Sequence, residues 1–342
     1  MLHKSHGIGM CQTWDFFIFY SKNIMLTAFL FALKITLPNI LLMLLGVMMQ
    51  KKQTINQSFV EIASDMVFNY CLPCLLFFSI LKSDIHFAEQ VDLIESGLMV
   101  TFGLFFLGEL FAYFFVKDSR DKGVFVQGVF RSNMAIMGLA TVTNAYGSQG
   151  VSIGAVYMGL LTIVYNVLSV ISLSRNDNNS QGVVKKAITM TKKIGQNPLI
   201  IALVSAFAYK LLQLPMPPEF IIKTGELLAA VALPLALICA GATLDIKSML
   251  NMTGVSMQAS IGRIIVAPIT AVVVGVLMQL SPIQMGVMFI MVTSPVAAAS
   301  YVMARSMGGN EILAANILGF TTVFSMFSLA IGMALLRHFG LA

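Results

Sequence analysis

Long apolar segments separated by short polar ones follow one another along the 342 residues of the chain. Each segment holds roughly 18 to 25 residues, which is enough to cross a hydrocarbon layer of about 30 Å as an α-helix. The pattern predicts an all-α integral membrane protein with ten transmembrane helices. We expect these spans at residues 27–49, 59–81, 94–116, 124–144, 151–174, 197–214, 220–243, 254–278, 283–305 and 312–336.

The composition agrees with this pattern. Hydrophobic residues make up 58% of the chain and charged residues only 11%, whereas about a quarter of the residues in soluble domains are charged. The net charge of +6 is distributed over separate loops, so it indicates contact with the lipid bilayer and argues against nucleic acid as a partner.

Basic residues gather in the loops on one side of the predicted membrane. They follow the first span (Lys51 and Lys52), the third (residues 117–122) and the fifth (residues 175–193). Since cytoplasmic loops are rich in Lys and Arg, we expect a multi-pass protein of the cell's inner (plasma) membrane with both termini outside the cytoplasm.

Two polar regions divide the chain into parts. Residues 1–26 contain WDFFIFY, which is too short for a span, and we interpret them as an N-terminal interfacial tail. Residues 175–196 contain RNDNNSQG and predict a cytoplasmic linker. The linker separates a first five-helix repeat (27–174) from a second (197–342).

The two halves share one sequence register. An offset of 161 residues pairs Pro73 with Pro234, Asp84-Ile85 with Asp245-Ile246, and Gly147 with Gly308. Because five is an odd number, the second half enters the bilayer from the opposite side. The sequence therefore predicts two inverted five-helix repeats.

Pro73 and Pro234 interrupt long apolar runs at matching positions in the two halves. A proline leaves a backbone carbonyl without its helical partner, and lipid cannot supply one. These helix breaks therefore predict positions that face protein or a water-lined cavity. The alternative is that each proline is a simple packing kink.

The fourth and ninth spans contain a second pair of breaks. Arg131, Ser132, Asn133 and Gly138 lie in the fourth span, and the offset pairs Asn133 with Ser294, which precedes Pro295 in the ninth. We expect both helices to be interrupted near the middle of the membrane and to bind a solute there with the six residues Arg131, Ser132, Asn133, Gly138, Ser294 and Pro295. Asn133 offers a donor and an acceptor. An interhelical hydrogen bond worth about 0.6 kcal/mol is the alternative.

The segments IGQNPLIIALVSAF (194–207), VYNVLSV (164–170) and FRSN (130–133) make the chain resemble the auxin efflux carrier family. That family includes bacterial malonate and malate permeases and the plant PIN auxin exporters. The resemblance implies crossing fourth and ninth helices beside the substrate site, and one domain moving against a scaffold. Ala140 stands where the family pattern has a crossing proline in the fourth span.

Three charges lie deep in apolar sequence: Glu109, Arg131 and Arg263. Charged residues cost about 2.5–3.5 kcal/mol each at the centre of a span on insertion scales, so they usually face the interior. Arg131 is a candidate for binding an anionic substrate, with snorkelling to the interface as the alternative. For Glu109 the options are a coupling proton or a static ion pair with an arginine, for which Arg263 is a candidate. Arg263 also has the same two options as Arg131.

Other chemistry has little support in the sequence. Cys71 and Cys74 have the spacing of a redox motif, yet they lie within a span. All four histidines lie in tails or a loop, and we expect no metal site and no cofactor beyond a coupling proton or sodium ion.

We therefore interpret the chain as a transporter and not an enzyme. The predicted function is secondary active transport of small organic anions, such as the dicarboxylates malate or malonate, by alternating access. The alternatives are a uniporter, channel or receptor of the same fold, and a membrane thiol oxidoreductase. The sequence leaves open whether the chain forms a homodimer.

Overall fold

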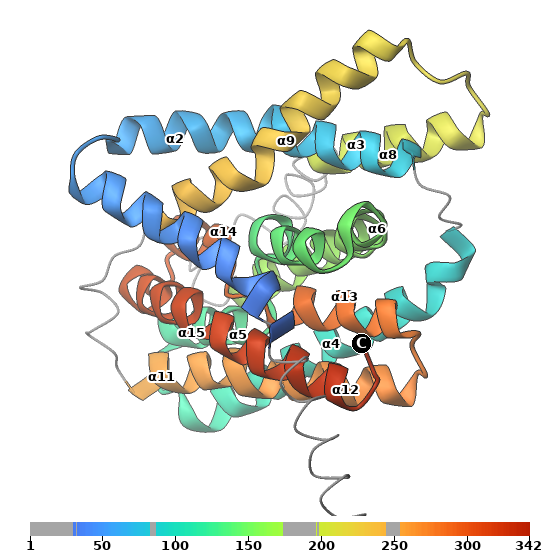
Figure 1. Ribbon diagram of the computed structural model, residues 1–342. Coiled ribbons are helices and arrows are strands. Elements are labelled where there is room, and N and C mark those ends of the chain that lie inside the picture. The colour runs from blue at the N-terminus through green and yellow to red at the C-terminus, as the bar shows by residue number, and fades with distance from the viewer. Residues whose placement is uncertain (1–29, 32, 83–86, 174–195, 197, 244–253) are drawn as a thin grey trace, which may run out of the picture.

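The computed structural model describes residues 30–31, 33–82, 87–173, 196, 198–243 and 254–342 (Figure 1). Within these residues the secondary structure is helical, and no named strand is found. In chain order the elements are the first helix Leu33–Lys51, α2 Gln57–Met66, η1 Val67–Cys71, α3 Leu72–Lys82, η2 Phe87–Gln90, α4 Val91–Phe115, α5 Ser119–Phe130, η3 Met134–Gly138, α6 Leu139–Leu173, α8 Pro198–Leu211, α9 Glu219–Ala242, α11 Gly254–Ile261, η5 Gly262–Val266, α12 Ala267–Leu277, α13 Pro282–Thr293, α14 Ala298–Ser306 and α15 Glu311–His338.

In the described part of the chain, seven helical segments are long and apolar enough to cross a membrane. Two shorter apolar helices, α8 and α13, fall below that length. The prediction of an all-helical, multi-pass membrane protein is thus confirmed, while the ten-span inverted repeat stays a prediction. The predicted tail (1–26) lies outside the described residues, as do all but residue 196 of the predicted linker and the pair Asp84 and Asp245.

The helices form two bundles. One contains α2, η1, α3, α8 and α9, which contact one another, and the other contains α4, α5, α6 and α11 to α15. In Figure 1 the first bundle lies above α6 and most of the second bundle lies below it. Contacts between the bundles run mainly from α6 to α3 and α8 and from η3 to α9.

Glycines join the first helix to α9. A Cβ at Gly46 would lie 2.0 Å from the carbonyl oxygen of Ile238, and a Cβ at Gly241 would lie 2.0 Å from that of Met43. Small residues let two membrane helices approach until their backbones touch. The first helix therefore belongs with α9 and completes the first bundle.

Several helix irregularities come just before prolines. The π-helical turn η1 ends at Cys71, two residues before Pro73, and the N–H of Leu72 bonds the Val67 carbonyl five residues back. Pro268 follows the π-helical turn η5, and the Ile264 carbonyl that this proline leaves without a helical donor accepts from the Ser328 hydroxyl at 2.5 Å. π-Turns and inserted side chains are common ways to absorb a break in a helix. Pro234 lies inside α9.

Candidate functional site

Two interrupted helices meet at the centre of the second bundle. α5 ends at Phe130 and η3 begins at Met134, while α13 ends at Thr293 and α14 begins at Ala298. The two gaps pair as an isolated antiparallel bridge between Ser132 and Val296. Unpaired backbone is costly inside a membrane, so each gap supplies the hydrogen bonds that the other lacks.

Two backbone hydrogen bonds hold this crossing. The N–H of Asn133 donates to the Pro295 carbonyl at 2.7 Å, and the N–H of Ala297 donates to the Arg131 carbonyl at 3.3 Å. Pro295 accounts for one gap, because a residue before proline avoids the helical conformation and Ser294 has ψ 147°. No proline is present in the other gap, which is stabilised by its partner.

Gly138 has a packing role at the crossing. A Cβ there would lie 2.8 Å from the Met291 sulfur and 3.2 Å from the Ser294 hydroxyl oxygen. The gap itself lies upstream, and the Gly138 N–H bonds the Asn133 carbonyl at 3.0 Å. Gly138 thus lets α13 approach the fourth span closely.

Arg263 joins the ends of the interrupted helices. It lies on η5, is fully buried, and donates from Nε to the Ser294 carbonyl at 2.9 Å. Its Nη1 donates to the carbonyls of Val129 and Phe130 at 3.0 and 3.1 Å. These carbonyls are at the C-terminal ends of α13 and α5, where the helix dipoles favour a cation.

The two predicted coupling residues lie on different elements. Within the described residues the hydrogen bonds of Arg263 go to carbonyls, and no carboxylate forms an ion pair with it. Glu109 is half-buried in α4. A coupling role for Glu109 stays a prediction.

The side chains of three other predicted ligands, Ser132, Ser294 and Arg131, already contact protein groups. The Ser132 hydroxyl lies 3.2 Å from that of Tyr165, and the Ser294 hydroxyl donates to the Ile290 carbonyl at 2.8 Å. Arg131 is buried and contacts α6 and α14. Both serine hydroxyls therefore have protein partners.

Asn133 differs from these residues because its side chain is available. It is half-buried, and its backbone groups hold the crossing. Its carboxamide makes no hydrogen bond to any residue that the structure describes. Among the predicted ligands it is therefore the one best suited to bind a solute.

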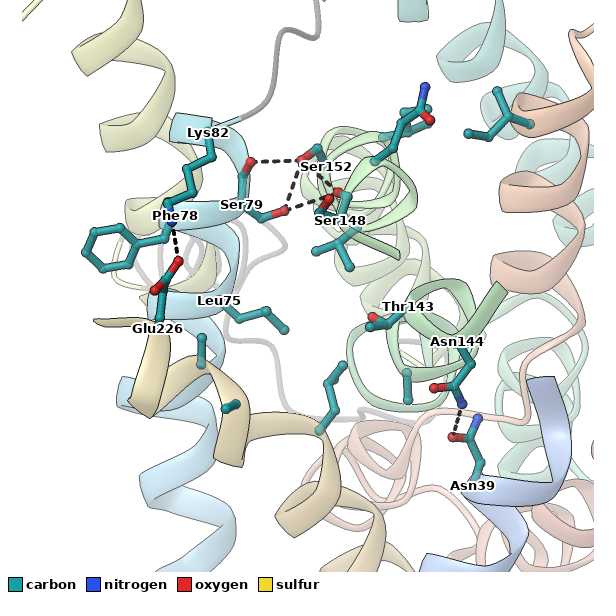
Figure 2. A pocket seen from close by; sticks show the side chains of 18 of the residues that line it. Asn39, Leu75, Phe78, Ser79, Lys82, Thr143, Asn144, Ser148, Ser152 and Glu226 are labelled. Carbon is teal, nitrogen blue, oxygen red and sulfur yellow. Dashed lines mark hydrogen bonds and ion pairs between the residues drawn. The ribbon is translucent and has the colours of Figure 1, made fainter. Parts of the chain in front are cut away.

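A cavity of about 1140 Å³ lies between the two bundles (Figure 2). Its walls come from the first helix, α3 and α9 on one side and from η2, α6 and the start of α13 on the other. Pro234, Ala230 and Ala140 line it, whereas Asn133 does not. Pro234 leaves the Ala230 carbonyl without a helical donor, and both residues lie on the wall of this cavity. That the two proline breaks serve a water-lined space stays a prediction.

Two clusters of side-chain hydrogen bonds join the two bundles at the wall of the cavity. Asn39 of the first helix donates to Thr141 at 2.8 Å and accepts from Asn144 at 3.0 Å. Ser79 of α3 and Ser152 of α6 lie 2.9 Å apart, hydroxyl to hydroxyl. Figure 2 shows both clusters on the cavity wall.

An ion pair also lies at the cavity. Lys82 of α3 bonds Glu226 of α9, and both side chains are exposed. Asn39, Ser79 and Lys82 were not among the functional residues predicted from the sequence. A polar residue within an apolar segment, such as Asn39 after Pro38, was the available signal.

The family model described as membrane transport protein matches residues 31–333. The chain belongs to this family. The resemblance to the auxin efflux carrier family is thereby confirmed, and the family is one of membrane transporters. Cys71 and Cys74 are free thiols at the junction of η1 and α3.

Two similar proteins carry the same general description. The uncharacterized transporter YfdV of Escherichia coli strain K12 is 24% identical over 295 residues, which cover 83% of this chain and 92% of YfdV. The uncharacterized transporter MJ1031 of Methanocaldococcus jannaschii is 21% identical over 308 residues, or 85% of this chain and 94% of MJ1031. The match thus spans nearly the whole length of each relative.

Proposed function

We propose that this family member is a secondary active transporter of small organic anions that works by alternating access around the crossing of its fourth and ninth spans. The observation that carries the proposal is the crossing itself, with the free carboxamide of Asn133 beside it. Helices broken within a membrane persist where they line a binding site or cavity.

The inverted repeat that the mechanism requires has local support. Gly147 and Gly308, paired by the offset of 161 residues, both have positive φ, at 59° and 72°. Asn133 and Ser294, paired by the same offset, both lie where a helix is interrupted. Positive φ angles and helix interruptions at equivalent positions of the two halves favour two copies of one five-helix unit.

Anions are favoured by the charges near the crossing. Arg131 and Arg263 are both buried, and neither forms an ion pair with a carboxylate within the described residues. Their positive charge attracts a negatively charged solute in a low-dielectric interior. A dicarboxylate such as malonate or malate is the first substrate to test, with a proton on Glu109 or a sodium ion as the coupling ion.

The arrangement in two bundles supports a moving domain. The cavity lies between them, and its lining includes Lys82 and Gln90, which the charge distribution predicts to be on the side outside the cytoplasm. On the other side Arg131 is buried under α14. This corresponds to an outward-open state, and rocking of one bundle against the other would expose the crossing to the cytoplasm.

The test is uptake of labelled malonate and malate into proteoliposomes. We expect saturable uptake by the intact protein and loss of uptake in Asn133→Ala. Asn69→Ala is the matched control, because Asn69 is exposed on η1, and it should transport normally. Unchanged uptake in Asn133→Ala would refute the site.

The same assay separates the alternatives. Flux that rises linearly with substrate concentration would favour a channel, and binding without flux would favour a receptor. Loss of activity on replacing both Cys71 and Cys74 with Ala would favour thiol chemistry. We expect that double variant to transport normally, because neither thiol lies at the crossing or lines the cavity.

A further inference from the structure

Arg131 lies in a polar environment that is separate from the cavity between the two bundles, called the outer cavity below. It follows α5 directly, and its side chain contacts three neutral groups from other helices. Nη1 donates to the Ser169 hydroxyl at 2.9 Å and contacts the Met303 sulfur, and Nη2 donates to the Asn166 side chain at 2.8 Å. None of these four residues lines the cavity between the bundles.

The guanidinium group is buried without a counter-ion. Arg131 is only 6% exposed, and among the described residues no carboxylate lies within ion-pair distance of it. The hydrogen bonds of Arg131 to those residues also leave its Nε–H and one Nη2 proton without a partner among them. A buried charge is normally paired with an opposite charge, so a missing anion is a specific signal.

Two further buried polar side chains, one turn away on the same helices, have no hydrogen-bond partner among the described residues. Gln127 lies one turn before Arg131 on α5, is 1% exposed, and both polar atoms of its carboxamide are without a hydrogen bond. Ser300 lies one turn before Met303 on α14, is 4% exposed, and its hydroxyl is also without one. Residues three or four apart on a helix are neighbours. Buried polar atoms are nearly always bonded in folded proteins, so these groups point to an absent ligand.

We propose that Arg131, Gln127 and Ser300 form an inner anion site that binds the carboxylate of the transported substrate on the cytoplasmic side of the crossing. The site lies between α5, α6 and α14, and α5 begins at Ser119, two residues after the basic residue Lys117 of a predicted cytoplasmic loop. It deepens the proposed function and rests on it, because the buried site becomes accessible when the transporter opens inward.

The chemistry of the three groups selects a carboxylate. A guanidinium with two free N–H groups binds a carboxylate through two parallel hydrogen bonds. The Gln127 amide and the Ser300 hydroxyl add donors, and the Gln127 carbonyl accepts from a substrate hydroxyl or a protonated acid. Met303 covers Arg131 with a thioether, a weak acceptor that an incoming carboxylate readily replaces.

The experiment measures carboxylate binding by the purified protein in detergent. Its melting temperature is followed against increasing sodium malonate and sodium malate, with sodium chloride at equal ionic strength as the control. We expect saturable stabilisation of the intact protein by a carboxylate and not by chloride. Gln127→Leu should weaken the apparent affinity by roughly tenfold or more, since one hydrogen bond to a charged group is lost.

Gln127→Leu separates a ligand from a structural role. Its buried carboxamide has no hydrogen-bond partner in the part of the chain that the structure describes, so the variant should melt at the same temperature as the intact protein or higher when no anion is present. A purely structural Gln127 would instead lower the melting temperature and leave the affinity unchanged. Ser300→Ala should behave like Gln127→Leu, and Arg131→Lys should bind weakly because it loses the bidentate contact.

The remaining outcomes overturn the inference. Absence of stabilisation by either carboxylate, or equal stabilisation by chloride, would exclude the carboxylate site. Unchanged affinity in both Gln127→Leu and Ser300→Ala would place any bound carboxylate elsewhere. In that case intact uptake in proteoliposomes would show that the proposed transport survives while the inner site does not.

Discussion

Arg263 should hold the crossing together, and replacing it with leucine tests this role. The guanidinium is fully buried and donates three hydrogen bonds to the carbonyls of Val129, Phe130 and Ser294. These carbonyls come from both interrupted helices. Arg263→Leu removes all three bonds and leaves two helix ends without their shared cation.

The size of the effect follows from the bonds that are lost. A hydrogen bond to a charged group contributes about 1.5–3 kcal/mol, so three contribute about 4.5–9 kcal/mol before other terms. The variant no longer buries a guanidinium, which offsets part of that loss. Each buried carbonyl left without this donor costs about 1–3 kcal/mol, and after the offset we expect the free energy of unfolding to fall by about 3–5 kcal/mol.

The assay is equilibrium unfolding of the purified protein in mixed micelles, monitored by circular dichroism. Arg305→Leu is the matched control, since the Arg305 side chain is 70% exposed and lies 3.5 Å from Glu311. An exposed pair contributes at most about 1 kcal/mol, so the control should unfold almost like the intact protein. Equal stability of Arg263→Leu and Arg305→Leu would refute a structural role for Arg263.

Three further predictions concern the two bundles. Gly241→Ala should lower the free energy of unfolding by about 1–3 kcal/mol, because its Cβ would lie 2.0 Å from the Met43 carbonyl oxygen; Gly103→Ala, with no atom within 4 Å of the new Cβ, is the control, and equal stability of the two would contradict the close contact. Pro234→Ala should stabilise α9 and slow uptake, since it restores a helical donor for the Ala230 carbonyl beside the cavity; faster uptake would argue against a role for this break. Lys82→Ala should change the free energy of unfolding by less than about 1 kcal/mol, because its ion pair with Glu226 is exposed, and a double-mutant cycle with Glu226→Gln giving a larger coupling would be inconsistent with that view.

The crossing could be anticipated from the sequence because its signals are local. Pro295 keeps the residue before it out of the helical backbone conformation, and the offset of 161 residues pairs this residue, Ser294, with Asn133. The extent of the fourth-span gap could not be anticipated. No proline is present there, and the extended conformation of residues 131–133 depends on bonds to residues more than 160 positions away.

Long-range contacts explain what sequence reasoning missed at the site. An ion pair with a carboxylate was one option for Arg263, and within the described residues its hydrogen-bond partners are backbone carbonyls 31 to 134 residues away. Every residue has a backbone carbonyl, so the sequence does not indicate which carbonyls accept these hydrogen bonds. The cavity residues Asn39 and Asn144 are 105 positions apart, and only the packing of the first helix against α6 brings them together.

Cysteine accessibility tests alternating access most directly. The four native cysteines are replaced with alanine, and Thr143, which lines the outer cavity, is replaced with cysteine. A membrane-impermeant maleimide is then added to either side of sealed vesicles, with and without malonate. The account predicts labelling from the outer side alone, at a rate that malonate changes by shifting the protein to its inward-open state. Labelling of this cysteine from both sides at equal rates, unaffected by malonate, would indicate a continuous pore and contradict it.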